Sequence, residues 1–532
     1  MNAVAAKEER LAVVLLLLAH ALLAVSGIFL HSLTYDELSH LPAGMAMADQ
    51  GEIVLNRQHP PLVKLLAGLA ANTTHPQLPL EGAAYQERRE WDFGSEVLFT
   101  SGNDHWALLR RGRLPTLLLS LLGGFFVYRF SRELFGADGG LYSLALWAFS
   151  PTILGHDGWV TMDAPLAGLT VTTLYSGWRL EKALAAGRPW PGWALAGGGG
   201  LGLALATKFS ALVVAAALAA ACLMPGGGIS WRQRLRPALL LTSAALLVLW
   251  ACYFFPRDPL FYWRDLGLVY RDLKADYLFY FAGELAPRFP LYFLATFALK
   301  STPVELLVLP VALLAWCCSS ERSPLLRFVI APALLFFLAT SALATNQGHR
   351  YLLPCYPLLF VLAGLLPAFL GRRWRHAGAL LWLLAGGQAF EALVHQPDQL
   401  AYFNAFAGGP EQGPHWLDDS NIDWNQDFGR LPAWLAAHGI GRVRGAFLGR
   451  IDPAFYGLDW EPIQQADLQL QPRPGAYLLS AHVLARLLPK ADQEGWHSDW
   501  LRRYQPVGVL GASLYLFVFP ENTAGPAREP GP

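Results

Sequence analysis

Long runs of apolar residues recur along this chain and restrict it to one broad architecture. The first run, residues 11–30 (LAVVLLLLAHALLAVSGIFL), is long enough to cross a bilayer as a helix. Hydrophobic residues make up 54% of the 532 residues and charged residues only 15%, which is too apolar for one soluble globular protein. Apolar runs predict roughly eleven transmembrane helices, near 11–32, 106–128, 139–154, 160–178, 191–207, 209–225, 237–255, 291–316, 325–344, 350–370 and 377–395. The predicted fold class is therefore an α-helical polytopic membrane protein, in which 139–154 and 191–207 are short enough to be tilted or to have other bounds.

The connections between these runs differ in charge, and that difference predicts their orientation. One set is short and basic, and with Lys7 and Arg10 it belongs in the cytoplasm by the positive-inside rule. Its basic residues are Arg129, Arg132, Arg179, Lys182, Arg188, Arg232, Arg234, Arg236, Arg322, Arg327, Arg372, Arg373 and Arg375. The opposite set contains two long loops, 33–105 and 256–290, and everything after about 396. We therefore expect a multi-pass protein of the inner cell membrane with a cytoplasmic N-terminus; a cleaved signal peptide is the alternative for the first run, but its apolar core is long for that.

The composition changes after residue 395, where the predicted transmembrane domain (1–395) ends. Residues 396–522 predict a small extracytoplasmic α/β domain, or cap, large enough for a core of its own. LPAWLAAHGI predicts a short helix closed by Gly441, GRVRGAFLG and GAYLLS predict strands, and VGVLGASLYLFVF predicts a hairpin turning near Gly511. Residues 523–532 predict a disordered tail.

Charge and cysteine content narrow the functional classes. The formal net charge is zero, so nothing indicates a nucleic-acid partner. The five cysteines fall in or beside apolar runs without CxxC or zinc-type spacing, which predicts buried thiols and no disulfide framework.

An adjacent acid pair, Asp36–Glu37, directly follows the first apolar run. Carboxylates at a membrane surface carry a solvation penalty unless they stay hydrated, pair with cations or take part in chemistry. Other polar groups are expected on the same outward side: Arg57, His59, Lys64, Arg110, Arg111, Arg113, His156, Asp157, Asp163, Lys208, Lys300, His349 and Arg350. Each alone has a structural explanation. A Lys or Arg near the end of a span commonly extends its charged group to the membrane interface, and an Asp between helices commonly caps a helix. Together they suit a site where cations neutralise a phosphate leaving group and a carboxylate acts as general base.

Motifs along most of the chain resemble a known superfamily. They are TYDELSHLPAG, NRQHPPLVKLLAG, RRGRLPTLL, SRELFG, SPTILGHDGWVTMDAP, GLALATKFSAL, YFAGELAPRFPLYFLATFALKSTP, NQGHRYLLPCYPLLF, LAYFNAFAGGPEQG and LDDSNIDWNQDFGRL, in this order. The chain is similar to the GT-C glycosyltransferases of the protein O-mannosyltransferase and aminoarabinose-transferase superfamily, and most similar to bacterial, phospholipid-carrier-dependent members of family 39 type. The resemblance implies a GT-C fold. It also implies transfer of a hexosyl, mannosyl or aminoarabinosyl group from a polyprenyl-phosphate carrier to an extracytoplasmic protein, lipid or glycan.

The resemblance also implies roles for single residues. Asp36 would be the base or the acceptor-orienting carboxylate, Glu37 would support it, and Asp163 matches the second acidic motif, although a helix cap or a partner for a buried cation is the alternative for Asp163. The predicted carrier-phosphate ligands are Lys64, Arg113, Lys208 and Arg350, and Arg110 and Arg111 leave the register of the Arg113 match open. The other substrate-site candidates are His59, His156 and Lys300.

Two departures from the superfamily pattern and one acidic stretch limit these expectations. Asn425 stands where related chains have Gly, so a turn there is expected to differ, and the chain lacks the β-trefoil domain of eukaryotic protein mannosyltransferases. The acidic residues Asp418, Asp419, Asp423 and Asp427 do not have the spacing of an EF-hand and predict a surface loop. No metal ligands are assigned, and a divalent cation is left open because the superfamily contains both metal-dependent and metal-independent members.

Two other functional classes compete with a transferase. A transporter or lipid flippase also accounts for eleven spans with charged groups at one face, but it predicts charges near mid-membrane and repeated halves, which the sequence does not show clearly. A non-catalytic membrane scaffold predicts that Asp36, Lys64 and Lys208 are individually dispensable.

Overall fold

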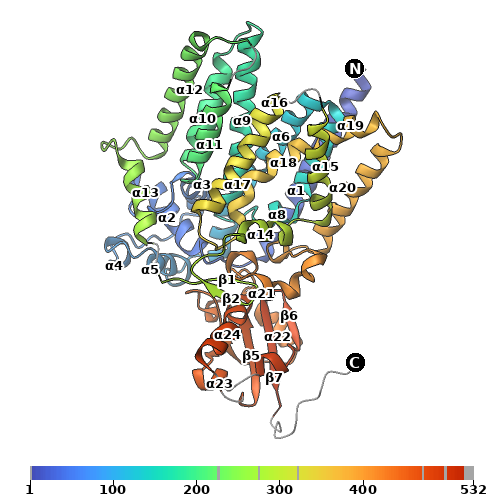
Figure 1. Ribbon diagram of the computed structural model, residues 1–532. Helices are drawn as coiled ribbons and strands as arrows, with labels where there is room; N and C mark the ends of the chain where they lie inside the picture. Colours follow the sequence, from blue (N-terminus) through green and yellow to red (C-terminus); the bar gives the residue numbers. More distant parts are fainter. Residues whose placement is uncertain are drawn as a thin grey trace.

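Helices form most of the chain before residue 395, and strands are concentrated after it (Figure 1). The computed structural model describes residues 3–224, 228–272, 276–319, 323–469, 472–495 and 500–520, so Arg322 and the predicted tail lie outside the described residues. The α-helices before residue 395 are α1 (Ala3–Leu30), α2 (Glu37–Gln50), α3 (Leu62–Asn72), α4 (Ala83–Gln86), α5 (Glu90–Ser95), α6 (His105–Phe135), α7 (Ala137–Ala148), α8 (Pro151–Leu154), α9 (Asp163–Ala185), α10 (Pro191–Leu205), α11 (Ala211–Leu223), α12 (Trp231–Cys252), α13 (Phe261–Asp272), α14 (Tyr292–Lys300), α15 (Pro303–Cys317), α16 (Ser323–Leu325), α17 (Ala331–Leu343), α18 (Tyr356–Ala363), α19 (Leu366–Gly371) and α20 (Ala377–Val394). Two π-helical turns, Glu96–Thr100 and Leu326–Ile330, and one 3₁₀ segment, His349–Cys355, adjoin them.

Six stretches of helix among the described residues are long and apolar enough to cross a membrane. They are Val4–Leu30, His105–Phe135, Trp231–Cys252, Ser323–Leu343, His349–Gly371 and Ala377–Val394. The predicted spans 139–154, 160–178, 191–207 and 209–225 correspond chiefly to α7, α9, α10 and α11, which have 12, 23, 15 and 13 residues. The structure therefore supports a multi-span helical protein, and the count of eleven spans stays a prediction.

One predicted span, 291–316, is wrong as a continuous helix. The chain bends by 116° between α14 and α15, so these two helices make at most one broken span. Pro303 disfavours a helical conformation at Thr302, the residue before it. Thr302 instead caps α15, because its side chain accepts from Glu305 N while Glu305 accepts from Thr302 N. The apolar pattern continues through this break, which is why it predicted a single helix.

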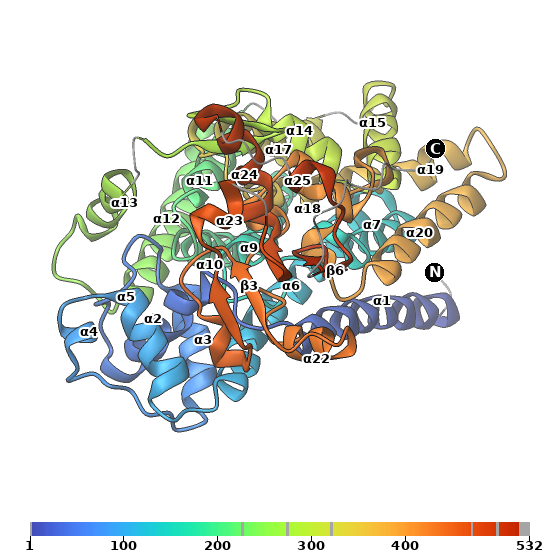
Figure 2. The ribbon, with the colours of Figure 1, turned by 90° about the horizontal axis from the view of Figure 1, so that it is seen from below.

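The three segments that the sequence places outside lie at one end of the helix bundle (Figure 1). The first, 33–105, folds into α2–α5, and the second, 256–290, into α13 and a hairpin of β1 (Phe279–Phe281) and β2 (Glu284–Ala286). The view from below shows the third, coloured orange to red, in the middle, with α2–α5 beside it (Figure 2). Their common position brings the polar residues of distant segments within reach of one another.

The C-terminal segment contains a five-stranded mixed sheet in the order β4-β3-β5-β7-β6. The strands are β3 (Val443–Ala446), β4 (Trp460–Pro462), β5 (Gly475–Ser480), β6 (Gly508–Leu510) and β7 (Leu514–Phe519); the helices are α21 (Gly413–Trp416), α22 (Leu431–Ala437), α23 (Gln465–Gln469), α24 (Ala481–Glu494) and α25 (Trp500–Arg503). Short 3₁₀ turns lie at Gln399–Ala401, Ala405–Ala407, Pro410–Gln412, Asp419–Asn421 and Pro453–Tyr456. β6 and β7 pair antiparallel around Gly511, which has a φ of +60°. Helix α22 ends at Ala437, and Gly439 rather than Gly441 has the left-handed conformation near its end.

The acidic stretch at 418–427 is buried, so its interpretation as a surface loop is wrong. Asp418, Asp423 and Asp427 are each 1% exposed. Cations neutralise two of them: Arg486, from α24, lies 2.5 Å from Asp418, and Arg430, three residues along the chain, bonds Asp427. Buried carboxylates are tolerated when they are paired and hydrogen-bonded in this way.

His482 in α24 gives the C-terminal segment a pH-dependent contact. Its Nδ1 lies 3.3 Å from Asp418 Oδ2. Burial opposes the charged imidazolium, but the Asp418 carboxylate outweighs it and raises the pKa of His482. A raised pKa in the folded state stabilises the fold below the unfolded pKa of about 6.5 and loses this contribution as the pH rises through the folded pKa. We expect the opening free energy of α24, measured by hydrogen exchange, to fall with rising pH, and His482→Gln to flatten this dependence. An equally steep dependence in the variant would assign it to another group.

Candidate active site

The start of α2, where the acid pair lies, is fixed by a close helix crossing and by a buried ion pair. Helices α2 and α3 touch at Gly44 and Gly68, where an added Cβ would collide with the backbone of the other helix. Arg113 in α6 donates from Nε and Nη2 to the two Glu37 oxygens, at 2.8 and 2.7 Å. Its remaining donors go to backbone carbonyls just before α2, those of Ile28, His31 and Ser32. The guanidinium therefore has no free N–H.

The hydrogen-bonding capacity of the Glu37 carboxylate is also occupied. Besides Arg113, it accepts hydrogen bonds from Thr34 N, Thr34 Oγ1 and Val160 N. Burial disfavours the carboxylate, but Arg113 and these N–H donors hold the pKa of Glu37 below its usual value. Because both side chains are 0% exposed, this pair positions the chain between α1 and α2 and offers nothing to a substrate.

Asp36, the other member of the acid pair, belongs to a separate group of charges. Arg350 Nη1 lies 2.8 Å from Asp36 Oδ2 and 3.6 Å from Asp163 Oδ2. Lys208 Nζ lies 2.6 Å from Asp163 Oδ1. We call these four residues the Asp36 cluster. Two carboxylates and two cations alternate in it, and they come from four segments that are far apart in the sequence.

Two aromatic rings hold the cations of the Asp36 cluster in place. The Tyr351 ring centroid lies 4.4 Å from Lys208 Nζ and 5.3 Å from the Arg350 guanidinium carbon. The Trp424 ring, from the C-terminal segment, lies 4.4 Å from the same carbon. Neither ring was predicted as a site residue, although both lie in motifs that carry the resemblance and Tyr351 directly follows Arg350. An aromatic beside a predicted cation is the signal that could have found Tyr351.

The Asp36 cluster keeps hydrogen-bonding capacity for an anion. Arg350 Nε is buried without a partner, and the only hydrogen bond recorded for Lys208 Nζ among the described residues is the one to Asp163. The side chains of Asp36, Lys208 and Arg350 are 18%, 18% and 12% exposed, so all three are partly exposed. Free charge-assisted donors beside a carboxylate can bind a phosphate and accept a proton in one place.

Three other cationic side chains that the sequence predicts in the site lie outside the Asp36 cluster. Arg113 forms the buried ion pair with Glu37. Lys64 Nζ donates to Asn56 O, Asn56 Oδ1 and His59 O, and burial lowers its pKa to about 7. Lys300 Nζ donates to the carbonyls of Leu400 and Asn421, at 2.9 and 2.6 Å. All three are buried and hydrogen-bonded within the protein, so they stabilise loops in this structure, and their roles toward a ligand stay predictions.

The two predicted histidines lie close to the cluster as neutral rings. His59 packs edge-on against His40 at 5.0 Å, and burial, the His40 ring and Lys64 lower its pKa well below the usual value. Burial lowers the pKa of His156 to about 3, and its Nδ1 has no partner. His156 does not combine with Asp36 and Asp163 into a group of metal-ligand atoms within 4.8 Å among the described residues.

Comparisons with known proteins agree with the resemblance seen in the sequence. The family model of dolichyl-phosphate-mannose-protein mannosyltransferase matches residues 99–254. The crystal structure of ArnT from Cupriavidus metallidurans in the apo state has a TM-score of 0.50 at 15% identity and covers 97% of this chain and 99% of that chain. The same protein bound to undecaprenyl phosphate gives a TM-score of 0.47 at 16% identity with the same coverage. The S. cerevisiae Pmt1–Pmt2 complex bound to the sugar donor gives 0.36 at 20% identity and covers 49% of this chain and 34% of that chain. No curated protein matches the chain.

These findings define the fold of the protein. The similarity to ArnT extends over nearly the whole chain, and at 15% identity it establishes the fold. This protein is a multi-pass membrane protein with the fold of the GT-C glycosyltransferases, and the predicted resemblance to that superfamily is confirmed.

Proposed function

We propose that this protein is an integral membrane glycosyltransferase. It takes a sugar from a polyprenyl-phosphate carrier and passes it to an extracytoplasmic acceptor hydroxyl or amine. The observation that carries this proposal is the Asp36 cluster, where one carboxylate lies 2.8 Å from an Arg350 guanidinium that retains an unpaired N–H. The family match over 99–254 supports the same reaction class. A transporter would need no such pairing of a base with free phosphate ligands at one end of the bundle.

The cluster suggests a direct displacement at the anomeric carbon of the donor sugar. The acceptor oxygen or nitrogen forms a bond to that carbon while the bond from the carbon to the phosphate oxygen breaks. Asp36 takes the acceptor proton, and the phosphate leaves with the bonding electrons toward Arg350 and Lys208. A single displacement of this kind inverts the anomeric configuration.

The other predicted residues receive supporting roles in this proposal. Glu37 and Arg113 position Asp36 through the backbone, because their side chains have no capacity left for substrate. Lys64 fixes the turn from Asn56 to His59 that lies beside the cluster. Asp163 holds Lys208 and shares Arg350 with Asp36, so it orients both phosphate ligands.

Transfer of labelled sugar tests the proposed function. The purified full chain, supplied with radiolabelled polyprenyl-phosphate sugars and a cell-envelope acceptor fraction, should attach label covalently to the acceptor. Mass spectrometry of the lipid that co-purifies should identify the carrier. Movement of the labelled lipid across a vesicle bilayer without covalent transfer would instead establish a flippase.

Lys208→Gln tests the phosphate site directly. Loss of one charge-assisted hydrogen bond to phosphate is worth about 1.5–3 kcal/mol, so we expect the KM for the donor to rise about 10–100-fold. Lys182→Gln is the matched control, since Lys182 is exposed in the last turn of α9. A donor KM that stays at the wild-type value in folded Lys208→Gln would remove Lys208 from the phosphate site.

A further inference from the structure

Two imidazoles from segment 33–105 lie beside the Asp36 cluster and keep ring nitrogens without a partner. The ring of His40, in α2, makes one hydrogen bond among the described residues, from Nδ1 to the Val160 carbonyl at 2.8 Å. The hydrogen bonds of His59 within the described part of the chain involve only its backbone. The two rings meet edge-on, with centroids 5.0 Å apart. One nitrogen of His40 and both nitrogens of His59 are therefore free.

Histidines that serve the core of this protein do not leave nitrogens free. The two ring nitrogens of His349 lie 3.2 Å from Thr296 Oγ1 and 2.7 Å from Tyr356 OH. Both ring nitrogens of His20 are bonded in the same way. Buried polar groups are almost always paired. His40 is only 3% exposed, so its free nitrogen points to a ligand rather than to a structural role.

The surrounding backbone fixes both rings in place. The Val160 carbonyl can only accept, so Nδ1 of His40 carries the hydrogen and Nε2 presents a lone pair. The same peptide segment is held by Glu37, which accepts from Val160 N at 2.9 Å. Lys64 Nζ bonds the His59 carbonyl at 2.7 Å and fixes the turn that carries the second ring. The two rings are thus positioned before any ligand binds.

Both rings border the part of the Asp36 cluster where the donor sugar has to lie. His40 is one helical turn after Asp36 and donates its backbone N–H to the Asp36 carbonyl at 3.0 Å, so the two side chains share a face of α2. Burial and the His40 ring lower the pKa of His59, and Lys208 and Arg350 lower it further. Such charge effects weaken with distance, so His59 lies near both proposed phosphate ligands.

The chemistry of the two rings suits hydroxyl groups. Burial lowers the pKa of His40 and of His59, so both are neutral at pH 7. A neutral imidazole has one donor and one acceptor, and a hydroxyl can pair with either. An ammonium group on the sugar can only donate. It would also approach the cations Lys64, Lys208 and Arg350, which have the strongest effects of any charged side chains on His59.

We propose that His40 and His59 form the sugar subsite of the donor, where each ring hydrogen-bonds a hydroxyl of a neutral hexose. Nε2 of His40 accepts from one hydroxyl, and the ring of His59 bonds a second. This inference rests on the proposed transferase function and adds the class of sugar to it, a hexose without an amino group. Two fixed hydrogen bonds select among hexoses by the direction of their hydroxyls.

Transfer from defined donors tests the subsite. The purified full chain is supplied with polyprenyl-phosphate mannose, glucose or galactose, with deoxy forms of the hexose that it accepts, and with polyprenyl-phosphate aminoarabinose. We expect transfer from a hexosyl donor and none from the aminoarabinosyl donor. Loss of a hydroxyl that a histidine bonds should lower kcat/KM about 10–100-fold.

Phenylalanine variants assign the hydroxyls to the rings. His59→Phe keeps the ring packing and removes no hydrogen bond of the side chain, so it should fold like the wild type. It should lower kcat/KM for the hexosyl donor about 10–100-fold and cause no further loss with the matching deoxy donor. His40→Phe should do the same for a different hydroxyl. The Kd for polyprenyl phosphate without a sugar should stay at the wild-type value in both variants.

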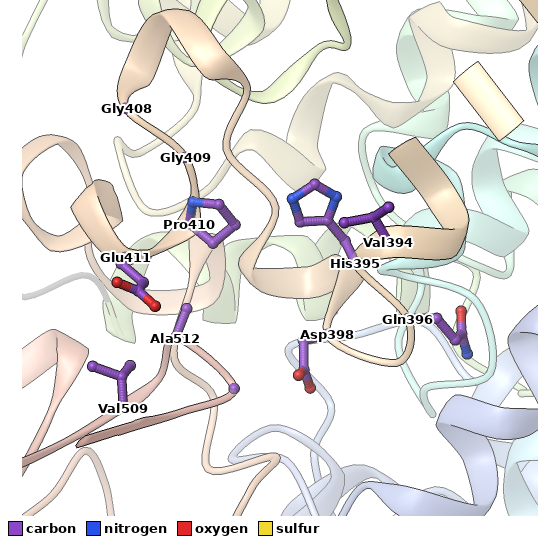
Figure 3. Close-up of a pocket in the computed structure, with 11 residues that line it drawn as sticks. Val394, His395, Gln396, Asp398, Gly408, Gly409, Pro410, Glu411, Val509 and Ala512 are labelled. Carbon is purple, nitrogen blue, oxygen red and sulfur yellow. The ribbon is translucent and has the colours of Figure 1, made fainter. Parts of the chain in front are cut away.

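His395→Phe is the matched control. His395 is partly exposed and lines a cavity of about 430 Å³ at the end of α20, together with Asp398 and Glu411 (Figure 3). No residue of the Asp36 cluster lines this cavity. The control variant should transfer every donor as the wild type does.

The outcomes separate this inference from the proposed function. Equal transfer of hexose by the wild type and by folded His40→Phe and His59→Phe would overturn the subsite and leave the transferase standing. Transfer of aminoarabinose alone would do the same. A wild-type chain that transfers no sugar from any of these donors would overturn the proposed function and the subsite together.

Discussion

Asp36→Asn is expected to lower the rate of sugar transfer by about 10²–10⁴-fold, the usual contribution of a general base. Asn has nearly the same shape as Asp, and its amide oxygen can still accept from Arg350 Nη1, which lies 2.8 Å from Asp36 Oδ2. It cannot take a proton from the acceptor. The fall should therefore appear in kcat, measured in single turnover with saturating donor. Donor binding should persist, because the phosphate ligands Arg350 and Lys208 are unchanged.

A matched substitution separates the role of Asp36 from a general effect of charge. Asp49 lies near the other end of the same helix, α2, and is exposed. Asp49→Asn removes one carboxylate by the same chemical change and should leave the transfer rate as in the wild type. If folded Asp36→Asn transferred sugar at the wild-type rate, the base would have to be another group, and Asp163 would be the next candidate.

The sequence predicted which types of residue meet in the Asp36 cluster better than it predicted their contacts. Asp36, Asp163, Lys208 and Arg350 are predicted from their expected position on one side of the membrane together with the resemblance to the GT-C glycosyltransferases, and the fold brings these four together. Lys64 and Arg113 were chosen by the same reasoning. Which cation stays free depends on the carbonyls and carboxylates that surround it, such as the three carbonyls bonded by Arg113. Those partners come from the tertiary structure, which a charge pattern does not contain.

The C-terminal segment shows in two places that the sequence pattern does not contain the tertiary contacts of a residue. The acidic residues at 418–427 are typical of a surface in composition, yet Asp418 is buried because Arg486 reaches it from α24. Asn425 departs from the expected Gly but has a φ of +69°, a conformation that Asn adopts more readily than most residues. Its side chain also donates to the Leu448 carbonyl at 2.8 Å. The turn therefore keeps a left-handed residue with a side chain that adds a contact.

Glu37→Gln is expected to lower the free energy of unfolding by about 3–5 kcal/mol, the usual effect of breaking a buried ion pair. Both Glu37 oxygens act only as acceptors, and they accept hydrogen bonds from Arg113, Thr34 and Val160. In Gln one of these oxygens becomes an NH₂ group, which faces donors and leaves the Arg113 charge buried without a counter-ion. Thermal and denaturant unfolding in detergent measure the effect, and the exposed Glu81→Gln in the same loop is the matched control.

A double variant tests whether the effect belongs to the pair. Once Glu37→Gln has broken the interaction, adding Arg113→Gln removes the uncompensated charge, so the two changes together should destabilise by less than the sum of the single variants. Strict additivity would show that the two side chains act separately. The activity of each variant gives the complementary result: Glu37→Gln should reduce the fraction of folded molecules more than the rate per folded molecule, and Asp36→Asn should do the reverse. Because these two carboxylates are neighbours in the sequence, this contrast would separate the residue that positions the loop from the residue that we propose carries out the proton transfer.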